Sequence, residues 1–236
     1  MNLQFKKGLR DGIPISLGYF SVAFGFGILC ASVGLTPWEA VAISASNLTS
    51  AGQVAGVGVI AAGGSYLEMA LTQLVINSRY SLMGLSLSQK LDDSFDTPNR
   101  LLISFSITDE IFAACNSKVE RLNKWYMYGI IPISAFGWIL GTYIGATAGQ
   151  ILPQALSDAM GIVLYGMFLA VIIPAARGNR GILAVICIAA LLSILFQYVF
   201  TAVSSGFAII ICAILAAAVG AVLFPVHEAE DEEVEA

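Results

Sequence analysis

The sequence predicts an all-α, polytopic helical membrane protein with about eight transmembrane helices, some of them interrupted near the membrane midplane. Three observations predict this fold class. The 236 residues are 58% hydrophobic and only 11% charged, with a mean hydropathy of +0.83. Apolar runs of about 20 residues, the length that a helix needs to cross a bilayer, recur along the whole chain. Polar side chains and glycines interrupt several of these runs.

Eight runs are expected to be spans, and together they form a single transmembrane domain over residues 1–225. The first follows Lys6, Lys7 and Arg10 and is too long for the apolar part of a signal peptide, so we expect a span rather than a cleaved leader. The expected spans are Ile13–Val33, Trp38–Ala62, Tyr66–Ser86, Leu101–Ser117, Tyr126–Ala148, Ala159–Ala176, Ile182–Val203 and Phe207–Phe224.

The fourth run is the weakest candidate because it contains Asp109 and Glu110. Its Leu, Ile and Phe residues favour insertion by roughly 2–4 kcal/mol, whereas two central acids oppose it by about 5–7 kcal/mol. We therefore expect it to span only if partner helices cover the acids or if one acid is protonated.

The distribution of basic residues predicts the orientation of these spans. With the N-terminus in the cytoplasm, only Lys90 and Arg100 fall on the outer side, which predicts a multi-pass cell-membrane protein with both termini cytoplasmic. The inner side receives Lys6, Lys7, Arg10, Lys118, Arg121, Lys124, Arg177 and Arg180.

The last residues and the rarer residue types exclude several classes of function. Residues 226–236 are rich in Asp and Glu and too poor in apolar residues to pack, so we expect a disordered acidic tail. The four cysteines lack metal or redox spacing, and His227 is the single histidine. There is no phosphate-binding glycine loop. We therefore expect no metal, no cofactor, no nucleic-acid partner and no enzymatic activity.

The polar stretch from Ser44 to Gly58 lies inside the second run and contains Ser46, Asn47 and Gln53. Lipid cannot satisfy these groups, so they must face protein or a water-filled cavity. Two interpretations remain open with equal weight. The stretch binds a solute near the midplane, as interrupted transporter helices do, or its small and amide residues hold packed helices together.

Further polar groups fall at a similar depth in the next two runs. Asn77 and Arg79 are central in the third run, and Asp109 and Glu110 are central in the fourth. One arginine and two carboxylates leave an excess of acid, which protonation of one carboxyl would relieve. We expect Asp109 and Glu110 to couple transport to protons, and Arg79 and Asn77 to bind solute; a fixed structural ion pair is the alternative.

The fifth run carries a strip of small residues instead of polar ones. One glycine in every four residues lies on one helix face, which predicts close packing against another helix of this chain or of a partner. The strip consists of Gly137, Gly141, Gly145 and Gly149. The motif Ile-Pro-Ile-Ser occurs at Ile13–Ser16 and again at Ile131–Ser134, which indicates either a duplication in the same orientation or chance.

Four motifs in this order resemble the AzlC family over roughly the whole membrane region. They are G-L-R-D-G-I-P-I at Gly8–Ile15, A-G-Q at Ala51–Gln53, I-N-S-R-Y-S-L-M-G at Ile76–Gly84 and T-D-E-I-F-A at Thr108–Ala113. The resemblance implies a secondary transporter that exports branched-chain amino acids and works with a small AzlD-type membrane subunit. The alternative is a membrane-embedded scaffold or assembly subunit without transport activity of its own. Association with a second copy of the chain also remains open.

Overall fold

The computed structural model describes residues 2–153 and 176–224, with 155, 166, 169 and 172–174. The chain divides into two compact units, Met1–Phe168 and Leu169–Ala236. Every regular element among the described residues is an α-helix, as the sequence predicts. Four of these helices are long and apolar enough to cross a membrane: α1, α8, α10 and α11.

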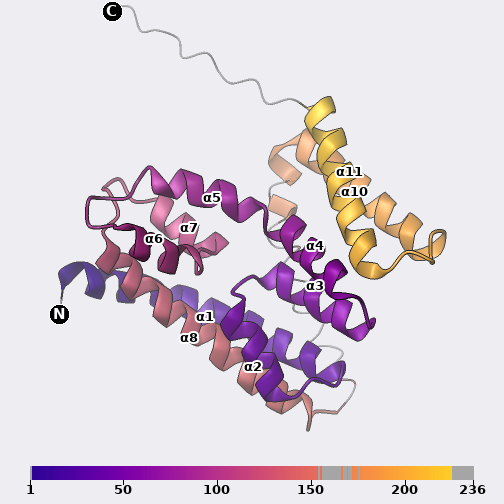
Figure 1. Cartoon of the computed structure of the whole chain (residues 1–236), viewed down its shortest axis with the longest axis horizontal. Coiled ribbons are helices and arrows are strands. Elements are labelled where there is room, and N and C mark those ends of the chain that lie inside the picture. Colours follow the sequence, from indigo (N-terminus) through magenta and orange to yellow (C-terminus); the bar gives the residue numbers. More distant parts are fainter. Residues whose placement is uncertain are drawn as a thin grey trace, which may run out of the picture. The chain divides into compact units, whose positions relative to one another are not determined.

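Two long helices, α1 (Leu3–Ser32) and α8 (Lys124–Gly149), form the frame of the first unit. They lie side by side along their whole length (Figure 1). Gly8 of α1 contacts Tyr126, and Gly149 at the far end of α8 contacts Ile28. Because the contacts advance in the same direction along both helices, α1 and α8 are parallel. The side of the unit on which both N-terminal ends lie is called the basic side, because most of the Lys and Arg residues of this unit lie there.

Six short helices complete the described part of the first unit. They are α2 (Pro37–Ser46), α3 (Ser50–Ala61), α4 (Tyr66–Asn77), α5 (Arg79–Ser88), α6 (Thr97–Ser104) and α7 (Asp109–Asn116). With 12 residues at most, none of these helices reaches the roughly 30 Å thickness of a bilayer core at about 1.5 Å per residue.

Helices α2 and α3 fold back on each other instead of forming one span. Ser44 of α2 is hydrogen-bonded to Thr142 of α8 at 2.7 Å, so α2 enters beside the C-terminal half of α8. Val57 of α3 belongs to the same buried cluster as Ala40 near the start of α2. Both ends of this first hairpin (residues 37–61) therefore lie on the side opposite the basic side, and its tip is Asn47–Thr49.

Helices α4 and α5 together cross from that side to the basic side. Helix α4 runs antiparallel to α3, since Gly52 lies against Asn77 and Gly64 lies against Glu68. Leu87 near the end of α5 packs in a buried cluster that includes Tyr126, at the N-terminal end of α8. The crossing is broken at Ser78, between the two helices.

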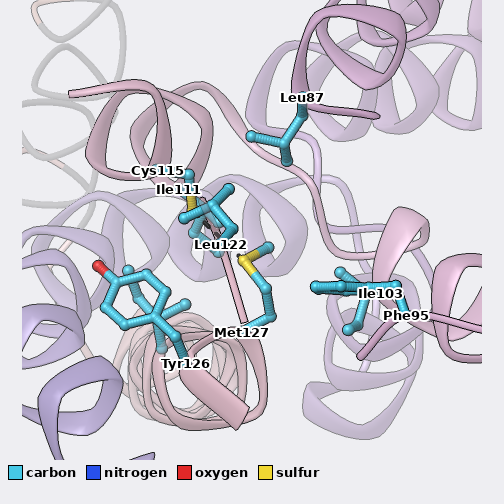
Figure 2. Close-up of a cluster of buried hydrophobic side chains, with 9 residues drawn as sticks. Leu87, Phe95, Ile103, Ile111, Cys115, Leu122, Tyr126 and Met127 are labelled. Carbon is cyan, nitrogen blue, oxygen red and sulfur yellow. Dashed lines mark hydrogen bonds between the residues drawn. The ribbon is translucent and has the colours of Figure 1, made fainter. Parts of the chain in front are cut away.

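Helices α6 and α7 form a second hairpin (residues 97–116) whose ends both lie on the basic side. The segments before α6 and after α7 pair through the bridge between Leu91 and Leu122. The Lys90 ammonium donates to the Asn116 carbonyl at 2.5 Å. Figure 2 shows the apolar cluster beneath these segments, which brings together the labelled residues Leu87, Phe95, Ile103, Ile111, Cys115, Leu122, Tyr126 and Met127.

The prediction of eight transmembrane helices is therefore not confirmed. The runs Trp38–Ala62 and Leu101–Ser117 are re-entrant hairpins because polar, threonine-capped breaks divide each into two halves of 12 residues or fewer. The segment Leu87–Arg100, expected on the outer side, lies on the basic side with the N-terminal ends of α1 and α8.

This arrangement places the basic residues of the first unit on one side, apart from Arg79 at mid-depth. The turns on the opposite side, Val33–Thr36 and Ala62–Ser65, contain no Lys or Arg. The basic side carries Lys6, Lys7, Arg10, Lys90, Arg100, Lys118, Arg121 and Lys124.

The same order of elements occurs twice in the first unit with opposite orientation. A crossing, α1, precedes the first hairpin, and a second crossing, α4–α5, precedes the second hairpin. Thr49 and Thr108 occupy matching places, because each caps the helix that leaves a hairpin tip. The unit is therefore an inverted pair of crossing-plus-hairpin elements, to which α8 is added parallel to α1.

The second unit contains α10 (Arg180–Tyr198) and α11 (Ser205–Leu223). They are antiparallel, since Gly181 at the start of α10 lies against Phe224, just past the end of α11. The expected span Ala159–Ala176 lies mostly outside the described residues, and the acidic tail lies entirely outside them.

Candidate functional site

The two hairpin tips meet near the middle of α1 and α8, and each ends in the N-terminus of a short helix. Thr49 accepts a hydrogen bond from the Gly52 amide at 3.3 Å, and Thr108 accepts one from the Ile111 amide at 3.4 Å. Threonine favours this capping role because its hydroxyl satisfies an amide that has no partner within the helix. Two helix N-termini, each with the positive end of its dipole, therefore point into the centre of the unit.

A cavity of about 370 Å³, called the tip cavity here, lies between the tips and α1. Its walls combine a charged part from α7 with an apolar part from α1 and the first tip. The polar or aromatic residues that line it are Tyr19, Ser50, Tyr80, Thr108, Asp109, Glu110 and Trp138, and the others are Pro14, Ile15, Gly18, Val22 and Leu48.

The ionisable groups in and beside this cavity do not form the single cluster that their common depth suggests. The Arg79 guanidinium lies 2.8 Å from the Asp109 carboxylate. Glu110 instead accepts a hydrogen bond from the Tyr19 hydroxyl at 2.6 Å. The second oxygen of Asp109 is buried and has no hydrogen-bond partner among the described residues. The site thus contains one paired carboxylate and a second one held by a phenol.

The predicted amide residues lie together on the other side of the first tip. The side chain of Gln73 accepts from Asn77 at 3.0 Å and from Asn47 at 3.3 Å, and it donates to the Gly52 carbonyl at 2.7 Å. Thr49 donates to Asn77 at 2.8 Å. This network fastens the first tip to α4, which is the packing role left open by the sequence.

A second cavity of about 240 Å³, called the amide cavity here, opens beside this network. It lies between the two arms of the first hairpin and α4, because Ile43 of α2 and Ile60 of α3 both line it. Its polar lining is Ser46, Asn47, Gln53 and Gln73. Of the five residues predicted to bind solute, three thus line the amide cavity, whereas Arg79 binds Asp109 beside the tip cavity and Asn77 belongs to the network.

Trp138 of α8 connects the two regions. Its indole N–H donates to the Gln53 side chain at 3.1 Å, and its ring packs edge-on against Tyr19 with centroids 5.3 Å apart. Tyr19 is in turn hydrogen-bonded to Thr108 and Glu110. A continuous chain of buried contacts therefore runs from the second tip to the first.

Comparison with known proteins identifies the family of this chain. The model of the AzlC protein family matches residues 14–152, which contain both hairpins and both cavities. The chain belongs to the AzlC family. It is 32% identical over 185 residues to the inner membrane protein YgaZ of Escherichia coli, covering 75% of this chain and 76% of YgaZ. It is 30% identical over 179 residues to an uncharacterized membrane protein of Archaeoglobus fulgidus, covering 75% and 78%. No solved structure matches. The family and these relatives make the chain a membrane protein with a transporter-type role.

The glycine strip of this AzlC chain lies against α1. A Cβ atom on Gly137, Gly141 or Gly145 would collide with a backbone carbonyl of α1, and one on Gly149 would approach the Ala31 side chain to 2.8 Å. The neighbour of the strip is thus a helix of the same chain. The close approach holds together the frame between the two tips.

Four residues at the centre of the site were not predicted from the sequence: Tyr19, Gln73, Thr108 and Trp138. Tyr19 and Gln73 are polar groups within apolar runs, which is the signal that could have identified them. Thr108 precedes two acids, and a threonine followed by acids is a typical start of a helix. Trp138 carries no such signal, because it stands among the packing residues of α8.

Proposed function

We propose that this AzlC protein is a secondary transporter that exports amino acids, with branched-chain amino acids as its substrates. The observation that carries the proposal is the tip cavity, where the carboxylates of Asp109 and Glu110, the first of them paired with Arg79, meet an apolar wall at mid-membrane depth. Charged side chains at this depth are costly and typically mark a solute or ion pathway. The cavity volume falls within the range of small-molecule sites.

The two kinds of wall suit the two parts of a branched-chain amino acid. The α-carboxylate would lie at the N-terminus of α3 and toward Arg79, because a helix N-terminus and a guanidinium both attract an anion. The α-ammonium would lie against the carboxylate of Glu110. The branched side chain would contact Ile15, Val22 and Leu48, which are apolar and line the cavity.

Proton coupling is the driving mechanism that the charges support. Two carboxylates face one guanidinium, and Glu110 is held by the neutral Tyr19 hydroxyl. Protonation of Glu110 would remove the excess negative charge and weaken the site for an ammonium group. Solute release would then accompany proton binding, as proton-coupled exchange requires.

The orientation follows from the concentration of basic residues on one side of the first unit. Cytoplasmic segments are enriched in Lys and Arg, so we place the basic side in the cytoplasm of the cell membrane. Arg177 precedes α10 and Arg180 begins it, and α11 returns antiparallel to α10, so the C-terminus would also be cytoplasmic.

A small AzlD-type membrane subunit is the proposed partner. The side chains of Arg79 and Asp109 are 41% and 40% exposed in this chain. A charged pair at mid-depth needs protein or water around it rather than lipid. A partner helix packed over this face would provide that cover, and its absence would leave the pair in contact with lipid.

The test is counterflow in proteoliposomes that contain this chain together with its AzlD-type subunit. Vesicles loaded with unlabelled leucine should accumulate labelled leucine, while vesicles loaded with lysine should not. Glu110→Gln should change the pH dependence of the exchange, whereas the matched change Glu120→Gln, in the loop after α7, should not. Failure of leucine, isoleucine and valine to exchange would refute the proposal in favour of a scaffold role.

A further inference from the structure

The tip cavity and the amide cavity follow one another across the depth of the first unit. The tip cavity reaches toward the basic side, since Pro14 and Ile15 of α1 line it. The amide cavity reaches toward the opposite side, since Val57 and Ile60 near the end of α3 line it. A solute that crosses the protein through both cavities would meet the charged one and the amide-lined one in succession.

A thin layer of side chains separates the two cavities. Trp138 lines the tip cavity, Gln53 lines the amide cavity, and the hydrogen bond between them joins the two walls. Both side chains are almost fully buried, with exposed fractions of 4% and 1%. Tyr19, 6% exposed, closes the layer by packing against the Trp138 ring.

The two sides of this layer are attached to the fold in different ways. Trp138 stands on α8, whose glycines meet the backbone of α1, so its position is fixed. Gln53 stands on α3, where Gly52 and Gly56 face the ends of the flexible side chains of Gln73 and Met69. Flexible side chains can yield to a shift that backbone contacts would prevent. The layer therefore joins α8, which is held by backbone contacts, to α3, whose glycines meet side chains.

We propose that Tyr19, Trp138 and Gln53 form the barrier of the transport path, and that the amide cavity is a second solute site. The proposal rests on the transport role proposed above. The second site would take the same zwitterion by hydrogen bonds from the neutral groups of Ser46, Asn47 and Gln73, which include both donors and acceptors. Movement of α3 away from Trp138 would break the Gln53 bond and connect the cavities.

The test uses single cysteines placed in each cavity, Ser46→Cys or Ser50→Cys, in a Cys187→Ser background. Among the native cysteines Cys187 is exposed, whereas Cys30, Cys115 and Cys212 are buried. A charged, membrane-impermeant maleimide is added to two kinds of vesicle. In one the basic side of the protein faces outward, and in the other it faces the lumen. Without a barrier substitution, we expect Ser46→Cys to react only from the side opposite the basic side, and Ser50→Cys only from the basic side.

Opening of the barrier should make both positions reactive from both sides. We expect Trp138→Ala to raise the labelling rate from the previously closed side at least tenfold. Gln53→Leu removes the hydrogen bond but keeps the bulk of the side chain, so we expect a smaller increase. Trp125→Ala, at an exposed tryptophan of the same helix, is the matched control and should leave the pattern one-sided. Thermal melting selects the variants that remain folded.

Several results would overturn the proposal. One is a one-sided pattern in either folded barrier variant. Another is a Ser46→Cys side chain that does not react from the side opposite the basic side, which would remove the amide cavity from the path. Labelling needs no transport, so the expected pattern without leucine counterflow would refute the export function and leave the barrier intact.

Discussion

The two hairpins have the same architecture but different chemistry at their tips. Each consists of two short helices, and in each a threonine caps the helix that leaves the tip. After Thr49 comes Ser50, and the surrounding polar groups are neutral amides. After Thr108 come Asp109 and Glu110, so the matching position carries two carboxylates. The comparison shows that two hairpins of the same architecture can provide a neutral site in one cavity and an ionisable site in another.

The attachments of the two hairpins differ as well. The first is connected to its neighbouring helices by short turns in which Gly34 and Gly63 adopt positive φ angles of 86° and 65°. The second is fixed by an ion pair of 2.6 Å between Lys118 and Asp11 and by the polar segments around Asp92. Among the described residues no ion pair holds the first hairpin, whereas ion pairs anchor the second.

The largest expected effect comes from breaking the frame that supports both hairpins. Gly145→Leu should lower the free energy of unfolding by about 3 kcal/mol or more, because its side chain would collide with the Phe24 carbonyl. The measurement is thermal or denaturant unfolding in detergent. Gly58→Leu is the control, since a Cβ at Gly58 meets no atom within 4 Å. Equal stability of the two variants would show that α1 and α8 need no close contact.

The second largest effect is expected from substitutions at the charged tip, where the neutral tip has no ionisable residue. Asp109→Asn and Glu110→Gln should leave the fold intact and flatten the pH dependence of transport, because a neutral amide mimics a protonated carboxyl. Arg79→Ala should cost about 1–3 kcal/mol, between exposed and buried ion pairs, since the pair is about 40% exposed. The measurements are vesicle transport against pH and thermal unfolding.

A double variant separates two roles of Arg79. If Arg79 only balances Asp109, adding Asp109→Asn to Arg79→Ala should restore transport. If transport stays lost, Arg79 meets the solute carboxylate. Wild-type pH profiles in both acid variants would disprove proton coupling through this site.

The sequence predicted much of the local structure. An interruption of the stretch Ser44–Gly58 was expected from its polar residues and glycines, and the structure places the break at Asn47–Thr49, before the glycines. The cavities lie at the polar groups that lipid cannot satisfy. The all-α class and the limits of most helices follow from apolar periodicity, glycines and caps. The packing of the glycine strip on α1 also agrees with its fourfold spacing, although its role in stability stays a prediction.

The course of the hairpins could not be read from hydropathy. A broken run of about 20 apolar residues has the same composition whether its second half continues or turns back. Whether the second half turns back depends on tertiary packing, such as the cluster that contains Val57 and Ala40 and the bridge between Leu91 and Leu122. The basic residues Lys90 and Arg100 were the available signal, because they were the two exceptions to the predicted charge distribution and the hairpins remove both exceptions. The contact between Glu110 and Tyr19 was also missed, because the two residues are far apart in the sequence and nothing in the sequence indicates that they meet.

A smaller effect is expected at the two caps. Thr49→Val and Thr108→Val should each cost about 1 kcal/mol, the usual value of an N-cap side chain. Thr108→Val also removes the bond to Tyr19, and thereby loosens the phenol that holds Glu110. We therefore expect Thr108→Val to shift the pH profile of transport and Thr49→Val to leave it unchanged. The same pH profile in the two variants would mean that the tips are equivalent.

The smallest effect concerns the polar segments that fix the second hairpin on the basic side. Partial burial raises the pKa of Asp92, but hydrogen bonds from Ser94 and Asn123 outweigh it, so the net pKa lies below its usual value. A carboxyl with a lowered folded-state pKa stabilises the fold above its unfolded pKa of about 3.9. That stability is lost as the pH falls through the folded pKa. Asp92→Ala should therefore cost on the order of 1 kcal/mol at neutral pH and less below about pH 3.9, measured by thermal unfolding against pH. Asp93→Ala, at the exposed neighbour, is the control. A destabilisation by Asp92→Ala that does not diminish in acid would mean that the segment depends on the shape of this side chain and not on its charge.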